Sequence, residues 1–215
     1  RLEINNIADD QNISRVSRCL DSIVGKSRPF ANIISECNFP IAAGLASSSS
    51  SFSALVVAAN NAMGNKYDTQ LLASQAGSAS GSAARSMLGG IVELNNIQND
   101  IEIKQLSSVE RWPLKVIIAI TNKEKKSISS SQAMKLSASS SPFYSSWINK
   151  QEADMCEGRL AIKNKDFERL AAVSEHNCLK MHSVMWTTRP SIIYWNEASL
   201  NCMHVIREMQ KTGEA

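Results

Sequence analysis

The chain has 215 residues, of which 43% are hydrophobic and 20% are charged, and its formal net charge is +3. This length and composition suffice to bury one sizeable core or two small ones, which argues against intrinsic disorder. The longest aliphatic runs, Leu55–Ala59 and Val116–Ile120, are far shorter than the ~20 residues that cross a bilayer, so we expect no membrane span. The modest charge and the scattered lysines and arginines argue against nucleic acid as a partner.

Two further features bear on the cellular setting. Charged residues interrupt the first twenty positions, which leaves no room for a secretory signal and predicts a cytoplasmic protein. The cysteines are odd in number and lack C-x-x-C spacing, so we interpret them as reduced and mostly small core residues rather than disulfides or zinc ligands. They are Cys19, Cys37, Cys156, Cys178 and Cys202.

The first part of the chain alternates between strand and helix patterns. The alternation of Leu2 and Ile4 predicts the end of a strand, residues 12–24 have helical periodicity, and residues 30–37 alternate as a strand does. Residues 38–64 are typical of a loop that leads into an amphipathic helix.

The next helix, with Asp68 or Thr69 as its cap, gives way to a segment of small residues that permits close backbone approach. Strand patterns follow at 91–94, 101–106 and 114–120, and we expect the last strand to be buried on both faces. Helical patterns then cover residues 129–138, 144–163, 166–182 and 191–211. A mixed first half and a helical second half predict an α+β fold with two lobes that meet near residues 121–127.

The serine-rich run from Gly44 to Ser51 is the most informative segment for function. An anion site can form here from the backbone N–H groups at a helix start, the positive end of the helix dipole and a row of hydroxyls. Phosphate is the anion that such a site most commonly binds. A serine-rich linker or a plain helix cap is the simpler alternative. The run lies between an apolar loop and an amphipathic helix, where a flexible linker is out of place. The Walker-type phosphate loop G-x-x-x-x-G-K-[ST] is absent.

Three other groups of residues carry weaker signals. Ser80, Ser82 and Arg85 place two hydroxyls and a guanidinium close together, and Arg suits a bidentate grip on a carboxylate, although a surface arginine after a turn is the commoner reading. The lysines Lys123, Lys125 and Lys126 could attract a polyanion or simply form a solvated loop. The histidines lack metal spacing and suit core or surface roles; they are His176, His182 and His204.

Two of these segments are similar to motifs of diphosphomevalonate decarboxylases, in the GHMP kinase superfamily and especially its bacterial branch. Residues 38–48, NFPIAAGLASS, resemble the phosphate-loop motif P-T-A-A-G-L-A-S-S, with Ile41 in place of Thr. Residues 80–90, SGSAARSMLGG, resemble the motif S-G-S-A-x-R-S-x-x-G-G. Weaker similarity continues through residues 125–126, 130–134, 141–144, 165–167 and 179–182. In this comparison Gly77 and Ser131 stand where relatives often carry basic residues.

The resemblance implies a two-lobed GHMP-kinase-like α+β fold. Its N-terminal lobe would be like domain 2 of ribosomal protein S5 and would include residues 1–122, with the phosphate loop. Its C-terminal lobe would be a ferredoxin-like arrangement of helices and sheet and would include residues 123–215. The chain resembles an internal fragment, incomplete at both ends, because the family's lysine-bearing N-terminal segment and its D-A-G-P-N segment have no counterpart here.

The resemblance also implies an activity: ATP-dependent decarboxylation of mevalonate 5-diphosphate to isopentenyl diphosphate, with Mg²⁺, by a cytoplasmic homodimer of the mevalonate pathway. The residues that would hold the ATP phosphates are Ala43, Gly44, Leu45, Ala46, Ser47, Ser48, Ser49, Ser50 and Ser51. The residues that would bind substrate are Ser80, Ser82, Arg85, Ser130, Ser131 and Met134. Arg85 would orient the carboxylate for loss, no protein side chain is assigned to a metal, and the family's catalytic aspartate lies outside this chain.

Two alternatives stay open on the sequence. A mevalonate 3-kinase, or another small-molecule kinase of the superfamily, would keep the fold without the elimination step. A non-catalytic binding domain is favoured by the absence of the aspartate and the lysine, since the fragment by itself would lack a general base.

Overall fold

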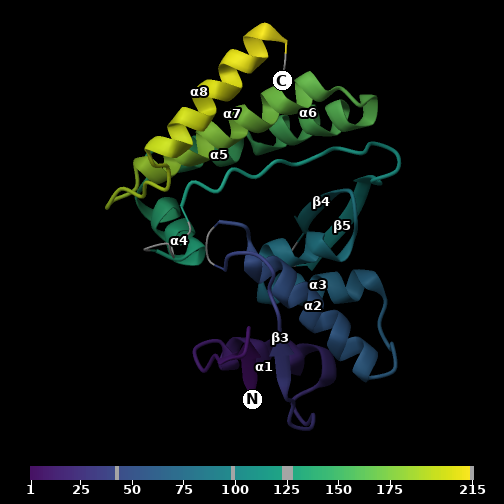
Figure 1. Ribbon diagram of the computed structural model, residues 1–215. Coiled ribbons are helices and arrows are strands. Elements are labelled where there is room, and N and C mark those ends of the chain that lie inside the picture. The colour runs from purple at the N-terminus through teal and green to yellow at the C-terminus, as the bar shows by residue number, and fades with distance from the viewer. Residues whose placement is uncertain (42–43, 98–99, 123–127, 214–215) are drawn as a thin grey trace. The chain divides into compact units, whose positions relative to one another are not determined.

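The chain forms two compact units in a computed structural model that describes residues 1–41, 44–97, 100–122 and 128–213. The first unit spans Arg1–Pro113 and the second Leu114–Ala215 (Figure 1). The sequence placed the lobe boundary between residues 122 and 123, and the division of the whole protein into lobes stays a prediction. The lysines at 123, 125 and 126 lie outside the described residues.

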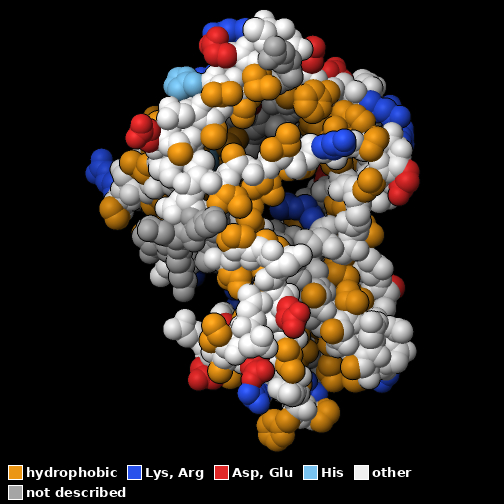
Figure 2. Space-filling view, viewed as in Figure 1, with side chains coloured by type: hydrophobic (Ala, Val, Ile, Leu, Met, Phe, Trp, Pro, Cys, Tyr) orange, Lys and Arg blue, Asp and Glu red, His pale blue; other side chains and the backbone are white. Residues whose placement is uncertain are grey.

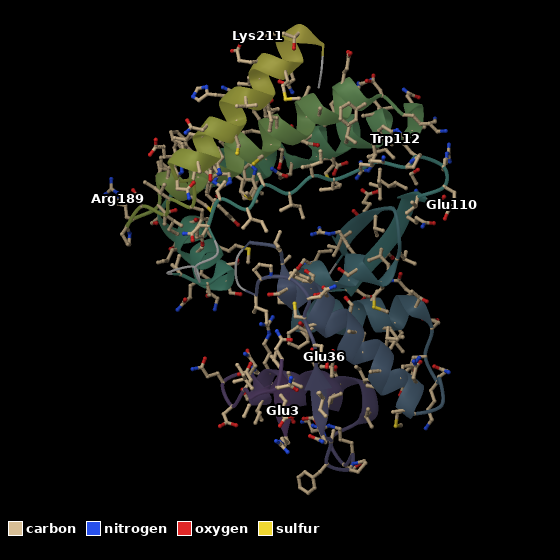
Figure 3. All side chains as sticks on the ribbon, in the orientation of Figure 1. Glu3, Glu36, Glu110, Trp112, Arg189 and Lys211 are labelled. Carbon is tan, nitrogen blue, oxygen red and sulfur yellow. The ribbon has the colours of Figure 1, made fainter. Side chains whose placement is uncertain are left out.

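The first unit begins with a small mixed sheet and one helix. The elements are β1 (Leu2–Ile4), β2 (Ile7–Ala8), α1 (Ile13–Val24) and β3 (Ile33–Ser35). β1 lies in the centre, antiparallel to β2 and parallel to β3. Parallel strands need a crossover connection, and α1 supplies it. Figure 3 labels Glu3, on β1, and Glu36, which follows β3. The predicted strand over 30–37 is thus present but shorter, and Phe30 is fully exposed.

Two helices, a 3₁₀ turn and a hairpin complete the first unit. They are α2 (Ser47–Ala62), α3 (Thr69–Ala79), η1 (Gly81–Met87), β4 (Ile91–Ile97) and β5 (Asp100–Ser107). The Asp68 carboxylate accepts a hydrogen bond from the Leu71 N–H, which confirms the predicted helix cap. β4 and β5 form an antiparallel ladder, as two of the strand patterns predicted.

The core of the first unit lies where α1, α2, α3 and η1 meet. Its buried side chains are Cys19, Ile23, Phe52, Val56, Leu72, Ala76 and Ala83. Burial of a large apolar side chain such as Phe52 or Val56 stabilises the fold by about 1.5–3 kcal/mol. The small alanines let η1 approach the helices closely. The core therefore fixes the position of residues 80–86, the segment that contains Ser80, Ser82 and Arg85.

Gly77 has a packing role on α3. A Cβ atom at this position would lie 2.4 Å from Cδ1 of Ile101 and 3.2 Å from Cβ of Ala84. The absence of a side chain therefore lets β5 and η1 lie directly against α3. A long basic side chain at position 77 would require the Ile101 side chain to move.

The described part of the second unit contains helices and no strands. The helices are α4 (Ser130–Ser140), α5 (Tyr144–Asn149), α6 (Gln151–Asn164), α7 (Phe167–Trp186) and α8 (Glu197–Thr212). α6 and α7 form a helical hairpin (Figure 1), and Lys165 adopts the left-handed conformation at its turn. The single helix predicted over 144–163 is interrupted at Lys150. None of the helices in the described part of the chain combines the length and apolar character that spanning a bilayer requires.

The prediction of a doubly buried strand over residues 114–120 is wrong in this structure. No described strand pairs with this segment, and Val116 and Ile117 are 84% and 95% exposed. The continuous apolar run carries the strand signal, but a strand forms only where a neighbour completes its hydrogen bonds.

The prediction that the cysteines are mostly core residues is also wrong, although all five thiols are free. Only Cys19 is buried, where its desolvation raises the thiol pKa to about 11. Cys156 on α6 and Cys178 on α7 are exposed.

His182 on α7 is the buried histidine of the second unit. Its ring lies 4.2 Å from the Trp195 ring, and Trp195 makes an edge-to-face contact with Trp186. The Nδ1 atom of His182 has no hydrogen-bond partner. Because burial disfavours the charged imidazolium, the pKa of His182 is lowered from 6.5.

We expect the free energy of unfolding to decrease as the pH falls from about 7.5 to about 5.5, because the unfolded chain binds a proton at position 182 before the folded chain does. Urea unfolding at the two pH values measures this effect. His182→Phe keeps an aromatic ring against Trp195 and should show a smaller decrease. The exposed His204→Gln is the matched control and should behave as wild type. Equal pH dependence in all three proteins would contradict the assignment.

Candidate functional site

The loop before α2 turns sharply into the helix. Gly44 has φ 96° and Ala46 has φ 53°, both in the left-handed region. The side chain at the N-cap position, Ala46, makes no capping hydrogen bond, and the first turn of α2 contains no acidic residue. The helix therefore does not neutralise its own positive N-terminal end, which suits an anion. The predicted phosphate ligand Ala43 lies outside the described residues.

The serines at the start of α2 point in different directions because successive helical residues are about 100° apart. Ser50 and Ser51 are exposed, and the Ser50 hydroxyl donates to the Ser47 carbonyl at 3.0 Å. Ser49 is only 7% exposed. The run thus contains a solvent-facing group of hydroxyls and a buried group.

The structure brings the serine run at the start of α2 into contact with the segment of residues 80–86. The Ser80 hydroxyl donates to the Ser48 hydroxyl at 3.2 Å, and the hydroxyls of Ser49 and Ser82 are hydrogen-bonded. These bonds join the start of α2 to η1 and the residue before it. The chain between them folds through α3, so residues more than thirty positions apart lie within one site.

Arg85 lies in the last turn of η1 and is exposed. No ion pair or hydrogen bond of its guanidinium is found within the described residues. Its neighbours Ala83 and Ala84 are fully buried, so the turn is anchored on one side while the arginine faces solvent. A cationic fork on an anchored turn is suited to binding an external anion.

Arg15 on α1 supports this region and was not singled out from the sequence. Its guanidinium donates two hydrogen bonds to the Ala79 carbonyl, at 2.6 and 3.1 Å, and lies 4.6 Å from the centre of the Phe52 ring. The Ala79 carbonyl is at the end of α3, immediately before Ser80. No local pattern marks Arg15, since its partner is 64 positions away in the sequence.

A mostly apolar cavity of about 260 Å³ opens beside the serine run. It is bounded by β1, β3, α1 and α2, and Ser47, Ser48 and Ser51 contribute to its wall. A separate hollow is lined by Asn5, Asn6, Glu36, Cys37 and Asn38. Ser47, Ser48 and Ser51 therefore border a recess rather than a flat surface.

The remaining predicted substrate residues lie in the second unit. Ser130, Ser131 and Met134 are in the first turns of α4, and all are exposed, Met134 at 64%. The preceding Ser129 caps this helix by accepting from the Gln132 N–H. Roles in substrate binding stay predictions for these residues, as they do for the serine run and Arg85.

The described residues offer no group of three or more His, Cys, Asp or Glu side chains that could hold a metal ion. Figure 2 shows lysine and arginine side chains scattered over the visible face, with acidic side chains among them.

Comparison with known families gives two matches that together cover nearly the whole chain. Residues 1–107 match the diphosphomevalonate decarboxylase-like N-terminal domain, and residues 116–215 match the mevalonate 5-diphosphate decarboxylase C-terminal domain. The two matched segments are separated by residues 108–115, where the compact units also divide.

Individual proteins of this family are similar over most of the chain. The diphosphomevalonate decarboxylase of Schizosaccharomyces pombe is 31% identical over 189 residues, which are 85% of this chain and 48% of the yeast protein. The chain thus spans about half the length of that curated relative. The mevalonate diphosphate decarboxylase of Staphylococcus aureus has a TM-score of 0.85 and 27% identity, over 99% of this chain and 66% of its own.

A further solved structure, MDDEF in complex with MVAPP, AMPPCP and magnesium, has a TM-score of 0.85 and 29% identity. The match covers 99% of this chain and 67% of the other. These similarities confirm the α+β fold predicted from the sequence.

Arg15→Lys is expected to lower the free energy of unfolding by about 1–3 kcal/mol, because lysine cannot make the paired hydrogen bonds to the Ala79 carbonyl or stack in the same way on Phe52. Urea unfolding of the protein measures the loss. Arg18→Lys on the same helix is the control, since Arg18 is exposed. Equal stability of the two variants would show that the Arg15 contacts contribute little.

Proposed function

We propose a function for the protein that carries this chain: it uses ATP to convert mevalonate 5-diphosphate into isopentenyl diphosphate and carbon dioxide. The chain belongs to the diphosphomevalonate decarboxylase family, as the matches to both of its domains show. In this reaction ATP phosphorylates the tertiary 3-hydroxyl, and phosphate and carbon dioxide then leave. The observation that carries the proposal is the pair of family matches over residues 1–107 and 116–215. The direct contact between the serine-lined start of α2 and the segment that bears Arg85 supports it.

The start of α2 is proposed to bind the ATP phosphates. Its N–H groups and the hydroxyls of Ser47 and Ser48 can donate to phosphate oxygens, and the positive helix end favours the negative charge. The left-handed turn at Gly44 and Ala46 leads the chain into the helix without an acidic side chain beside this end. Residues Leu45, Ser49, Ser50 and Ser51, with Ala43, complete the proposed loop.

Arg85 is proposed to hold the C1 carboxylate of the substrate. A bidentate guanidinium fixes both the position and the plane of a carboxylate, which orients it for loss of carbon dioxide. Ser80 and Ser82 lie on the same segment and can bond substrate oxygens. Ser130, Ser131 and Met134 are proposed to flank the diphosphate end.

Mg²⁺ is proposed to bind together with ATP. The described residues near the start of α2 offer hydroxyl oxygens and no carboxylate cluster. That donor set fits an ion carried mainly by phosphate oxygens and water, with Ser47 or Ser48 as an additional ligand. When bound, the ion would neutralise charge on the phosphates. A cytoplasmic homodimer stays a prediction from the family resemblance.

The test of the whole proposal uses the complete protein that carries this chain, with ATP, Mg²⁺ and mevalonate 5-diphosphate. Release of carbon dioxide with isopentenyl diphosphate as product supports it. A stable 3-phosphate without carbon dioxide would instead identify a mevalonate 3-kinase. Binding of both ligands without turnover would favour a non-catalytic domain.

Arg85→Ala should lower kcat/KM for mevalonate 5-diphosphate by about 10- to 100-fold, the effect of losing a charge-assisted hydrogen bond. The midpoint of thermal unfolding should change little, because the side chain is exposed. Arg85→Lys keeps the charge without the fork and should fall between wild type and the alanine variant. A parallel loss of stability and activity would count against a role in substrate binding.

Ser47→Ala and Ser48→Ala should each weaken ATP binding by about 5- to 10-fold, corresponding to one lost hydrogen bond. Calorimetric titration of the complete protein with a non-hydrolysable ATP analogue measures this change. Ser22→Ala on α1 is the control, because the Ser22 hydroxyl donates to the Cys19 carbonyl of its own helix. Unchanged affinity in both loop variants would show that the phosphates bind elsewhere.

A further inference from the structure

Ser53, two residues beyond the serine run, is the second buried hydroxyl on the face of α2 that meets η1. It is 6% exposed, and Ser49 on the preceding turn is 7% exposed. A buried hydroxyl is costly unless it is hydrogen-bonded, so each must have a partner. The partner of Ser49 is the Ser82 hydroxyl on η1.

Ser53 Oγ lies 2.7 Å from the Ser49 carbonyl oxygen and 2.8 Å from the Ala83 carbonyl oxygen. The hydroxyl has one proton, so it donates fully to one of these oxygens or shares the proton between them. The Ser49 carbonyl belongs to the same helix, whereas the Ala83 carbonyl belongs to η1. Donation to Ala83 therefore connects two elements that are 30 positions apart in the sequence.

The η1 turn depends on such external contacts. A 3₁₀ helix has poorer hydrogen-bond geometry than an α-helix and is rarely long. The buried residues of η1 are Ala83 and Ala84, and their methyl groups cannot fix its position along the surface of α2. The directional contacts are the Ser49–Ser82 hydrogen bond and the bond from Ser53 to the Ala83 carbonyl, and only the second holds the η1 backbone, two residues before Arg85.

We propose that Ser53 is a positioning residue that holds η1 against α2 and thereby sets the distance from Arg85 to the start of α2. The inference rests on the proposed function, in which Arg85 binds a carboxylate and the start of α2 binds a phosphate. Transfer between the two ligands requires a fixed separation, and a shift of about 1 Å at a positioning group can reduce turnover by up to about 100-fold.

The experiment compares Ser53→Ala with Ser78→Ala in the complete protein. Ser78 is a matched control because its hydroxyl also donates to the carbonyl four residues earlier, that of Ser74 at 3.0 Å, but the residue is exposed and this bond stays within α3. The measurements are kcat for carbon dioxide release, KM for ATP and amide hydrogen exchange over residues 83–88.

For Ser53→Ala we expect kcat to fall about 10-fold, KM for ATP to stay within about 2-fold, and amide exchange over residues 83–88 to accelerate about 10-fold. Ser78→Ala should match wild type in all three. Ser53→Cys, which has similar volume and a weaker donor, should restore part of kcat and provides a second variant where the alanine protein is too unstable to assay.

Unchanged exchange over residues 83–88 in Ser53→Ala would overturn the proposal, as would an unchanged kcat with reduced stability. Equal losses in Ser78→Ala would also overturn it. If the wild-type protein releases no carbon dioxide, the proposed function fails. The exchange measurement still decides separately whether Ser53 holds η1.

Discussion

The hydrogen bonds between α2 and η1 are the constraint on which the candidate site depends. Three hydroxyls of α2, those of Ser48, Ser49 and Ser53, meet Ser80, Ser82 and the Ala83 carbonyl. Each bond has a modest net value, about 0.5–1.5 kcal/mol, but leaving a buried partner unsatisfied costs about 1–3 kcal/mol. Slipping η1 along α2 would break several bonds at once, which makes one arrangement strongly preferred.

Apolar packing and polar contacts have different effects in this region. The buried cluster around Phe52, Val56 and Leu72 brings the helices together but does not by itself define their register. Arg15 then fixes the end of α3 at the Ala79 carbonyl, and the α2 serines fix η1. The exposed guanidinium of Arg85 is consequently carried on a backbone that is held on both sides of Ser80.

Small residues make this close approach possible. Ala83 and Ala84 are fully buried against the helices, and Gly77 leaves room for Ile101. Larger side chains at these positions would push η1 or β5 away from α3 and lengthen the serine contacts. The small residues of this segment, which predicted close backbone approach from the sequence, therefore produce a tightly packed site.

The sequence by itself determined most of the elements and both candidate segments. Periodicity located α1, α2, α3, α4, α7, α8 and the stretch that divides into α5 and α6, a cap at Asp68 or Thr69 marked the start of α3, and the serine run indicated an anion site. Local physics suffices there, because caps, periodicity and helix dipoles act within a few residues. The prediction of a strand over residues 114–120 was wrong for the opposite reason, because a strand depends on a pairing partner that its own residues do not supply. Only the tertiary structure decided that Ser48 and Ser49 meet Ser80 and Ser82, and that Arg15 and Ser53 support them, because those contacts join positions 30 or more residues apart.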